Sequence, residues 1–155
     1  MTKNTLKYLA ALAILVILGL GALYFIRYLQ YQNSPERQAE EFVKAWERAY
    51  REDTYGGITP EETLQLFIDA LKKGDTDLAA KYFLVDDQEK WRMNLLTTKE
   101  NNKLELMIED LENLVRGKTT NSEVFFVLTD KTNTVTIQMI IGENPYTKKW
   151  KIFEM

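Results

Sequence analysis

Apolar positions near the start of the chain form one unbroken run. Tyr8 to Ile26 are nineteen residues without a charge, between Lys7 and Arg27. At 1.5 Å rise per residue, a helix over this run is about 28 Å long, close to the roughly 30 Å hydrocarbon thickness of a bilayer. Only a helix or a closed barrel satisfies its own backbone hydrogen bonds there. The pattern therefore predicts a transmembrane helix over residues 8–26, after a short basic cytoplasmic head at residues 1–7.

Two other interpretations of this run stay open. A core helix of a soluble domain is one, although such a helix is seldom apolar on every face. A cleavable signal peptide is the other, because Lys3 and Lys7 form a basic start and Gly19 and Gly21 are small. The run is longer than the usual signal core and no A-x-A cleavage site follows it. We favour a retained anchor, whose interfacial belt consists of Tyr24, Phe25, Tyr28 and Tyr31.

The predicted orientation of the span depends more on the order of head, span and downstream domain than on the flanking charges. Lys3 and Lys7 precede it and Arg27 and Arg37 follow it, so the basic residues are nearly balanced. A short head, one span and a larger downstream domain is typical of a signal-anchor. We therefore expect a single-pass protein of the cell membrane, with a cytoplasmic N-terminus and an extracytoplasmic C-terminal domain. The chain has no cysteine, so the thiol needed for bacterial-type lipoprotein acylation is absent.

Residues 27–58 are predicted to form a juxtamembrane amphipathic helix and a linker. Ser34 can cap a helix with Pro35 at its first position. One face of that helix is apolar: Ala39, Phe42, Val43, Trp46, Ala49 and Tyr50. This face can pack on its own domain, lie along the membrane surface or self-associate; two heptads are too few to identify a coiled coil. Thr54 to Ile58 contains paired glycines and is expected to be a short flexible joint, with the compact domain beginning after it.

Helical signals continue from residue 59. Thr59-Pro60-Glu61-Glu62 has the form of a capping box, and Gly74 is placed to end the helix. The expected buried face consists of Leu64, Phe67, Ile68 and Leu71. Asp75 or Thr76 can then cap a short helix that carries Leu78, Ala79, Tyr82 and Phe83.

The next segments predict helices and then strands. Residues 86–103 are expected to form a short helix and then a loop at 97–103. Residues 102–116 are expected to form a third helix that covers a sheet and stops at Gly117, with apolar positions at Leu104, Met107, Ile108, Leu111, Leu114 and Val115. The period then changes to two, which predicts strands at 123–129, 134–141 and 148–154. A turn at 130–133 and a longer connection at 142–147 suggest an antiparallel meander. Helices first and strands after give an α+β domain.

The stretch from Thr59 to Phe83 resembles the opening of nuclear transport factor 2-like domains, including small exported bacterial ones. That family shows an amphipathic helix, then Gly-Asp, then a short helix ending near Tyr-Phe, and a last strand that often carries Trp-x-Ile. Matching positions in this chain are Lys73-Gly74-Asp75, Tyr82-Phe83 and Trp150-Lys151-Ile152. The resemblance covers residues 59–155. It implies a cone in which a curved antiparallel sheet wraps a helix, often around an apolar pocket, in a family whose members include enzymes, binding modules and assembly parts.

Charge excludes some partners. Three basic residues and no acidic residue precede position 28, so the rest of the chain has a formal charge of −6 against −3 for the whole chain. A nucleic acid or an anionic lipid surface requires a basic patch, and the sequence has none. The expected partners are the lipid bilayer, through the N-terminal helix, and a protein or a small apolar ligand.

No residue is predicted to be catalytic, cofactor-binding or metal-binding, and no cofactor is expected. Asp86, Asp87 and Glu89 lack the alternate ligands and glycine turn of a calcium loop, so they are interpreted as a solvated acidic turn. The same interpretation applies to the group Glu109, Asp110 and Glu112. The three tryptophans, Trp46, Trp91 and Trp150, are interpreted as packing residues.

The functional hypothesis is a membrane-anchored extracytoplasmic binding or interaction module with no identifiable catalytic chemistry. The alternative is a structural component of a membrane-associated, secretion-type assembly. A third interpretation is an isomerase- or dehydratase-like enzyme. Because the chain has no histidine, that enzyme would need a buried carboxylate beside a tyrosine, and no motif places one.

Overall fold

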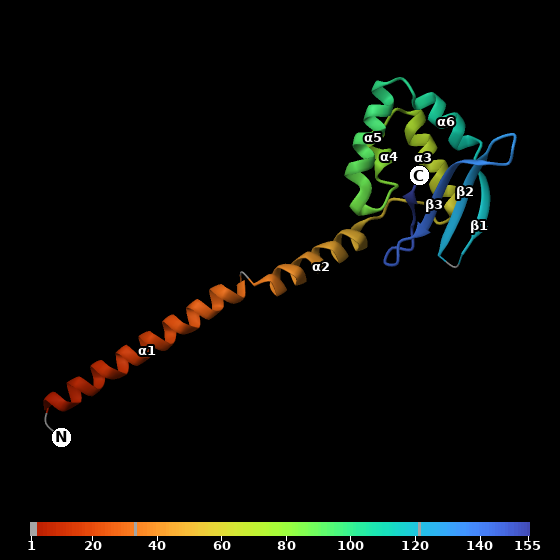
Figure 1. The fold of residues 1–155 in the computed structure, drawn as a ribbon. Coiled ribbons are helices and arrows are strands. Elements are labelled where there is room, and N and C mark those ends of the chain that lie inside the picture. Colours follow the sequence, from red (N-terminus) through yellow and green to blue (C-terminus); the bar gives the residue numbers. More distant parts are fainter. Residues whose placement is uncertain (1–2, 33, 121) are drawn as a thin grey trace. The chain divides into compact units, whose positions relative to one another are not determined.

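The computed structural model describes residues 3–32, 34–120 and 122–155 and divides into two compact units, Met1–Glu47 and Arg48–Met155 (Figure 1). The first unit contains α1 (Lys3–Gln32) and most of α2 (Pro35–Glu52). The second unit contains the remaining helices, α3 (Pro60–Lys72), α4 (Thr76–Ala80), the 3-10 turn η1 (Val85–Asp87), α5 (Gln88–Glu100) and α6 (Leu104–Glu112). Its strands are β1 (Val115–Thr119), β2 (Glu123–Thr129), β3 (Val135–Glu143) and β4 (Trp150–Glu154).

Helix α1 is the one helix in the described part of the chain that is long and apolar enough to cross a membrane. The candidate span is Leu12–Gln32, and none of it is buried within the protein. A core helix would bury at least one face. The prediction of a single apolar N-terminal helix is therefore confirmed, although the helix runs further at both ends than the expected 8–26.

Helix α2 begins where the sequence predicts. The Arg37 backbone N–H donates to Ser34 Oγ at 3.3 Å, and Pro35 is the first helical residue. Burial differs along its apolar face. Phe42 and Val43 are exposed, whereas Tyr50, in the second unit, is only 5% exposed.

Residues 54–58 were expected to form a flexible joint, but this segment is bound to strand β4. The Trp150 N–H donates to the Gly57 carbonyl at 3.0 Å, and Thr63 Oγ1 accepts from the Gly57 N–H at 2.9 Å while donating to the Trp150 carbonyl at 3.0 Å. Gly56 has a φ of +117°, and a Cβ there would lie 2.2 Å from the Trp150 oxygen. The glycines are needed because the chain approaches β4 closely here. The compact unit begins at Arg48, not at residue 59 as expected.

Helix α3 follows its sequence signals closely. Thr59 is the N-cap, its side chain accepts from the Glu62 N–H, and Gly74 follows the helix with a φ of +67°. The Glu62 carboxylate accepts from the Ile58 N–H at 2.6 Å, one residue earlier than in a standard capping box. The predicted face is buried: Leu64, Phe67, Ile68 and Leu71.

Helix α4 is shorter than predicted. Asp75 caps it through the Leu78 N–H at 2.9 Å, but the helix ends at Ala80. Tyr82 lies in the turn that follows, and both Tyr82 and Phe83 are buried. The Ile152 N–H donates to the Tyr82 carbonyl at 2.9 Å, so this segment lies along β4. The chain thus leaves the helix through a turn, in which the Phe83 N–H donates to the Ala80 carbonyl at 3.1 Å, and then pairs with β4.

The prediction of a loop at residues 97–103 is wrong for its first half, because α5 continues to Glu100. Thr97 and Thr98 donate their side-chain hydroxyls to the carbonyls of Met93 and Asn94, at 3.0 and 2.9 Å. A threonine that bonds back to the preceding turn is compatible with a helix, so the polar composition did not break it.

The end of the third predicted helix is also wrong. Helix α6 stops at Glu112, where the Asn113 side chain donates to the Glu109 carbonyl at 2.8 Å. Val115 pairs with Val127, so Gly117 belongs to strand β1 and is not a helix stop. All five residues of β1 are exposed, so the strand has no alternating burial to mark it in the sequence.

The four strands form one antiparallel sheet in the order β1-β2-β3-β4. Val124 pairs with Ile141, and Ile141 pairs with Ile152, so these three buried side chains form one row across the sheet. Helices α3 to α6 pack together beside the sheet, and α3 contacts both β4 and α6 (Figure 1). The α+β class and the meander are confirmed; the cone shape stays a prediction.

Candidate functional site

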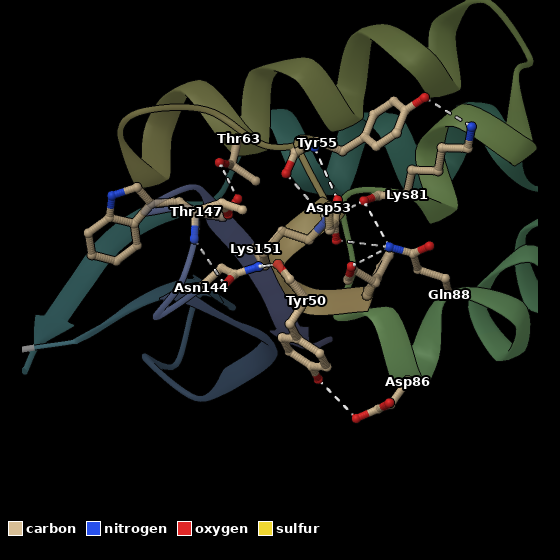
Figure 2. Close-up of polar contacts among 12 residues, drawn as sticks. Tyr50, Asp53, Tyr55, Thr63, Lys81, Asp86, Gln88, Asn144, Thr147 and Lys151 are labelled. Carbon is tan, nitrogen blue, oxygen red and sulfur yellow. Dashed lines mark hydrogen bonds and ion pairs between the residues drawn. The ribbon is translucent and has the colours of Figure 1, made fainter. Parts of the chain in front are cut away.

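A buried ion pair joins the end of the α2 segment to the last strand. Lys151 Nζ lies 2.7 Å from Asp53 Oδ2, and the two side chains are 1% and 5% exposed. Lys151 also donates to the carbonyls of Tyr55, at 3.3 Å, and Lys81. Buried charges are tolerated when they are paired and hydrogen-bonded, as here. Figure 2 shows these groups converging from three parts of the chain.

The Asp53 carboxylate accepts further hydrogen bonds from its neighbours. Its Oδ1 accepts from the Tyr55 N–H at 3.1 Å, and its Oδ2 accepts from Gln88 Nε2 at 3.3 Å (Figure 2). Gln88 also donates to the Phe83 carbonyl at 3.2 Å, so α5 is held to the segment that runs along β4. These contacts hold residues 53–55, α5 and β4 together.

Burial lowers the pKa of Lys151, and the Asp53 carboxylate opposes that shift. A lysine with a lowered pKa is a usual nucleophile in enzymes that form Schiff bases. Here the whole residue has no exposed surface, and three protein oxygens surround the amine. A substrate has no route to the nitrogen in this conformation, so the geometry fits a structural role for this lysine.

A second carboxylate lies beside a tyrosine, which is the pairing that an isomerase-like site would need. Tyr50 donates its hydroxyl to Asp86 Oδ2 at 2.9 Å (Figure 2). Burial and the nearby carboxylate raise the pKa of Tyr50, so its phenol stays protonated. Asp86 itself is exposed and neither residue lines the groove described next. The pair is therefore separate from that groove.

An apolar groove lies between helices α5 and α6 and the end of the sheet. Its volume is about 380 Å³. Apolar side chains supply most of the lining: Trp91, Leu95, Leu106, Met107, Leu111, Ile137 and Met155. Asn94, Thr98, Lys103 and Asp110 add polar groups. A mostly apolar hollow with a few polar groups is the usual form of a small-molecule site.

One part of the groove lining packs on the aromatic core, and another part is adaptable. Trp91 stacks on Phe83 with ring centroids 4.3 Å apart, and Phe83 meets Phe67 edge-on at 5.3 Å. Met107 and Met155 are unbranched and can change rotamer to suit an occupant. Leu106 is 59% exposed, so a large apolar side chain stands at the mouth without a cover. The groove can therefore accept an apolar group without disturbing the core.

A second hollow, of about 480 Å³, lies near the start of α6 and is lined by Lys72, Lys73 and Lys99 among other residues. Lys72 is paired with Glu112 at 2.5 Å, and Lys99 donates to the Gly74 carbonyl at 2.7 Å. Two of the three amines are thus engaged within the protein. This leaves the apolar groove as the better candidate for binding.

The acidic groups noted in the sequence are dispersed. Asp86 bonds to Tyr50, while Glu89 pairs with Arg92 at 2.6 Å, which lowers the pKa of the Glu89 carboxyl. Glu112 pairs with Lys72, and Asp110 lines the groove. Within residues 3–32, 34–120 and 122–155 no three metal-ligating side chains gather into a possible metal site.

The tryptophans have separate surroundings. Trp91 packs on Phe83 and also lines the groove, so it is both a packing residue and part of the candidate site. Trp150 packs against the hydrophobic core from β4. Trp46 lies in the first unit, on the apolar face of α2.

Sequence reasoning did not find the Lys151–Asp53 pair or the groove. A lysine that alternates with apolar residues in a strand normally points to solvent, so Lys151 gave no sign of burial. Most of the apolar groove residues fall on helical positions that equally suit a core face.

Comparisons of this chain with protein-family models, curated proteins and solved structures found no match. The resemblance to nuclear transport factor 2-like domains therefore stays a prediction.

Proposed function

We propose that this protein is a membrane-anchored binding module whose groove between α5 and α6 takes an apolar group of a ligand or partner. The observation that carries the proposal is the mostly apolar lining of the groove, of which Leu106 is exposed to solvent. A hollow of this size with a mostly apolar lining and a few polar groups is the usual form of a small-molecule site. The exposed helix α1 supplies the membrane half of the proposal.

The arrangement gives a simple physical mechanism. Helix α1 spans the bilayer with its N-terminus in the cytoplasm, and the second unit is held outside, near the membrane. Anchoring keeps the module at a high local concentration for any partner in the same membrane. The buried Lys151–Asp53 pair ties residues 53–55 to strand β4 within the second unit, which also contains the groove.

A photocrosslinking experiment in native membranes tests the groove. A photoreactive amino acid replaces Leu106, and in a matched variant it replaces Val115, which is 66% exposed in β1 and does not line the groove. Irradiation followed by mass spectrometry of the intact protein should give an adduct at position 106 and not at position 115. Equal labelling at both positions, or none at either, would contradict the proposal.

The mass of the adduct distinguishes a module that binds a small ligand from a component of a membrane assembly. A small apolar adduct identifies a ligand-binding module. A reproducible heterologous protein identifies a component of a membrane assembly, which the exposed apolar face of α2 also favours. Loss of the adduct when Trp91 is replaced by alanine would further locate the contact in the groove, because Trp91 forms part of its wall.

A further inference from the structure

Two charged side chains of opposite sign line the apolar groove between α5 and α6. They are Lys103 and Asp110, and the other side chains that line the groove are uncharged. Lys103 is exposed and Asp110 is half-buried. Among the residues that the structure describes, neither side chain has a hydrogen-bond or ion-pair partner. The groove therefore presents a cation and an anion that the folded chain itself does not pair.

Both charges also lie where helix α6 does not favour them. Lys103 is the N-cap residue and its side chain makes no capping bond, although the positive end of the helix dipole lies there. Asp110 lies in the last turn, where the negative end of the dipole disfavours a carboxylate. A local preference that is ignored without a compensating contact is expected at a functional site. The two charges thus have no role in stabilising α6 that would explain them.

The charges and the apolar residues between them share one face of α6. Lys103, Leu106, Met107 and Asp110 follow the i, i+3, i+4, i+7 spacing of a helix face. The Met107 N–H donates to the Lys103 carbonyl at 3.1 Å, so the helical register already includes Lys103. At 1.5 Å rise per residue, the two charged positions are about 10 Å apart along the axis. The groove offers a cation, an apolar stretch and an anion in this order.

The walls of the groove suit a helix better than an extended peptide. The wall that α5 supplies is uncharged and consists of Trp91, Asn94, Leu95 and Thr98, again at helical spacing. Backbone groups within α5 and α6 are bonded inside their own helices, so they offer no ladder of free N–H and C=O groups to a strand. A helix satisfies its own backbone and needs only side-chain contacts from such a groove.

A small apolar molecule is a poorer match for the two charges. An acyl chain would cover Asp110 without supplying a cation, and a carboxylate that loses water without gaining a partner is destabilising. A fatty acid would pair Lys103 alone. Both side chains are paired only by an occupant that carries an acidic and a basic group about 10 Å apart, with apolar groups between them.

We infer that the groove binds an amphipathic helix of a partner protein. An acidic residue of that helix lies against Lys103, and a basic residue seven positions away lies against Asp110. Apolar residues between these two enter the groove beside Leu106. Met107 and Met155 line the groove and can change rotamer to fit them. The inference rests on the proposed function and adds the chemistry of the occupant to it.

Three synthetic peptides test the inference. Each has about 18 residues, mostly alanine and glutamine so that it is helical. All three carry leucines at the third and fourth positions of the pattern and a fluorophore. They differ in the flanking pair, which is one glutamate with one lysine, two glutamates or two lysines. Binding is measured by fluorescence anisotropy with the full chain in phosphatidylcholine nanodiscs, and empty nanodiscs give the lipid background. The peptide with one charge of each sign should bind about fivefold more tightly than either of the others.

Two variants of the groove should switch this preference. Asp110→Lys should favour the peptide with two glutamates, and Lys103→Glu should favour the peptide with two lysines. Long-range attraction alone gives another result, because the chain has a formal charge of −3 and would favour the two-lysine peptide in every variant. A preference of the parent chain for the two-lysine peptide, preferences that do not change in the variants, or no binding of any peptide would each overturn the inference.

A neutral fluorescent dye, N-phenyl-1-naphthylamine, separates this inference from the proposed function. Leu106→Glu should reduce dye uptake by placing a charge in the groove, and the two charge variants should keep the uptake of the parent chain. If the groove takes the dye but none of the peptides, only the helical occupant is contradicted. If Leu106→Glu leaves dye uptake unchanged, the groove takes no apolar group and the proposed function is contradicted as well.

Discussion

Lys151 and Asp53 form an ion pair of 2.7 Å in which neither side chain is more than 5% exposed. The lysine belongs to the last strand of the sheet, and the aspartate follows helix α2. The sheet is thus tied to the segment that leads back to the N-terminal helices, and the compact unit begins at Arg48.

Lys151→Met should lower the free energy of unfolding by about 3–5 kcal/mol, because it leaves the Asp53 carboxylate buried without its cation. Urea denaturation of the full chain in detergent, followed by tryptophan fluorescence, measures the change. Lys118→Met is the matched control, since Lys118 is an exposed lysine of strand β1 and its replacement should cost under about 0.5 kcal/mol.

A double-mutant cycle shows whether the loss comes from the pair itself. Lys151→Met together with Asp53→Asn should cost less than the sum of the two single changes, with a coupling of about 0.5–3 kcal/mol. Strict additivity would mean that the two residues do not interact in solution.

Tyr50→Phe should reduce the loss of stability at alkaline pH. The pKa of Tyr50 is raised in the folded protein, so above about pH 10 the unfolded chain loses a proton that the folded chain keeps. The Tyr50 contribution is complete below that pH and is lost as the pH rises towards the folded pKa. The unfolding free energy of the parent chain should therefore fall more steeply above about pH 10 than that of Tyr50→Phe. Parallel pH profiles would show that burial and the Asp86 bond do not raise the pKa of Tyr50 in solution.

The sequence was most informative where local chemistry decides the structure. Ser34, Thr59 and Asp75 each cap the helix expected of them, and strand β2 has its predicted bounds. A cap needs only a neighbouring N–H, and an alternating strand shows its buried face directly.

The sequence failed where a distant partner decides. Val115 continues the apolar spacing of α6, but pairing with Val127 places it in a strand. Lys151 has the position of a solvent-facing strand residue, but Asp53 and two backbone carbonyls enclose it. From the sequence alone, the residues that line the apolar groove look the same as residues of a buried helix face. The space between them arises only from the way α5 packs against α6.

Gly56→Ala should destabilise the second unit, because its Cβ would lie 2.2 Å from the Trp150 carbonyl oxygen at a φ of +117°. Holding an alanine in that backbone region costs about 1–3 kcal/mol before any clash is counted. Gly117→Ala is the control, since its Cβ would meet neighbours at ordinary distances from 3.4 Å. Thermal unfolding followed by tryptophan fluorescence should show a lower midpoint for Gly56→Ala alone. An equal shift in both variants would mean that residues 55–57 do not hold their close contact with β4.

Replacing Leu15 and Leu18 with arginine should release the chain from membranes or block its insertion. Both side chains are exposed on α1 and lie within the candidate span. Each arginine near the middle of a bilayer costs about 2.5–3.5 kcal/mol on insertion scales, so two of them remove much of the driving force for insertion. Leu15→Phe with Leu18→Phe keeps the segment apolar and should fractionate like the parent chain. The measurement is the share of protein that sediments with membranes after an alkaline carbonate wash. If the arginine variant sediments as fully as the phenylalanine variant, α1 does not anchor the protein by spanning the bilayer.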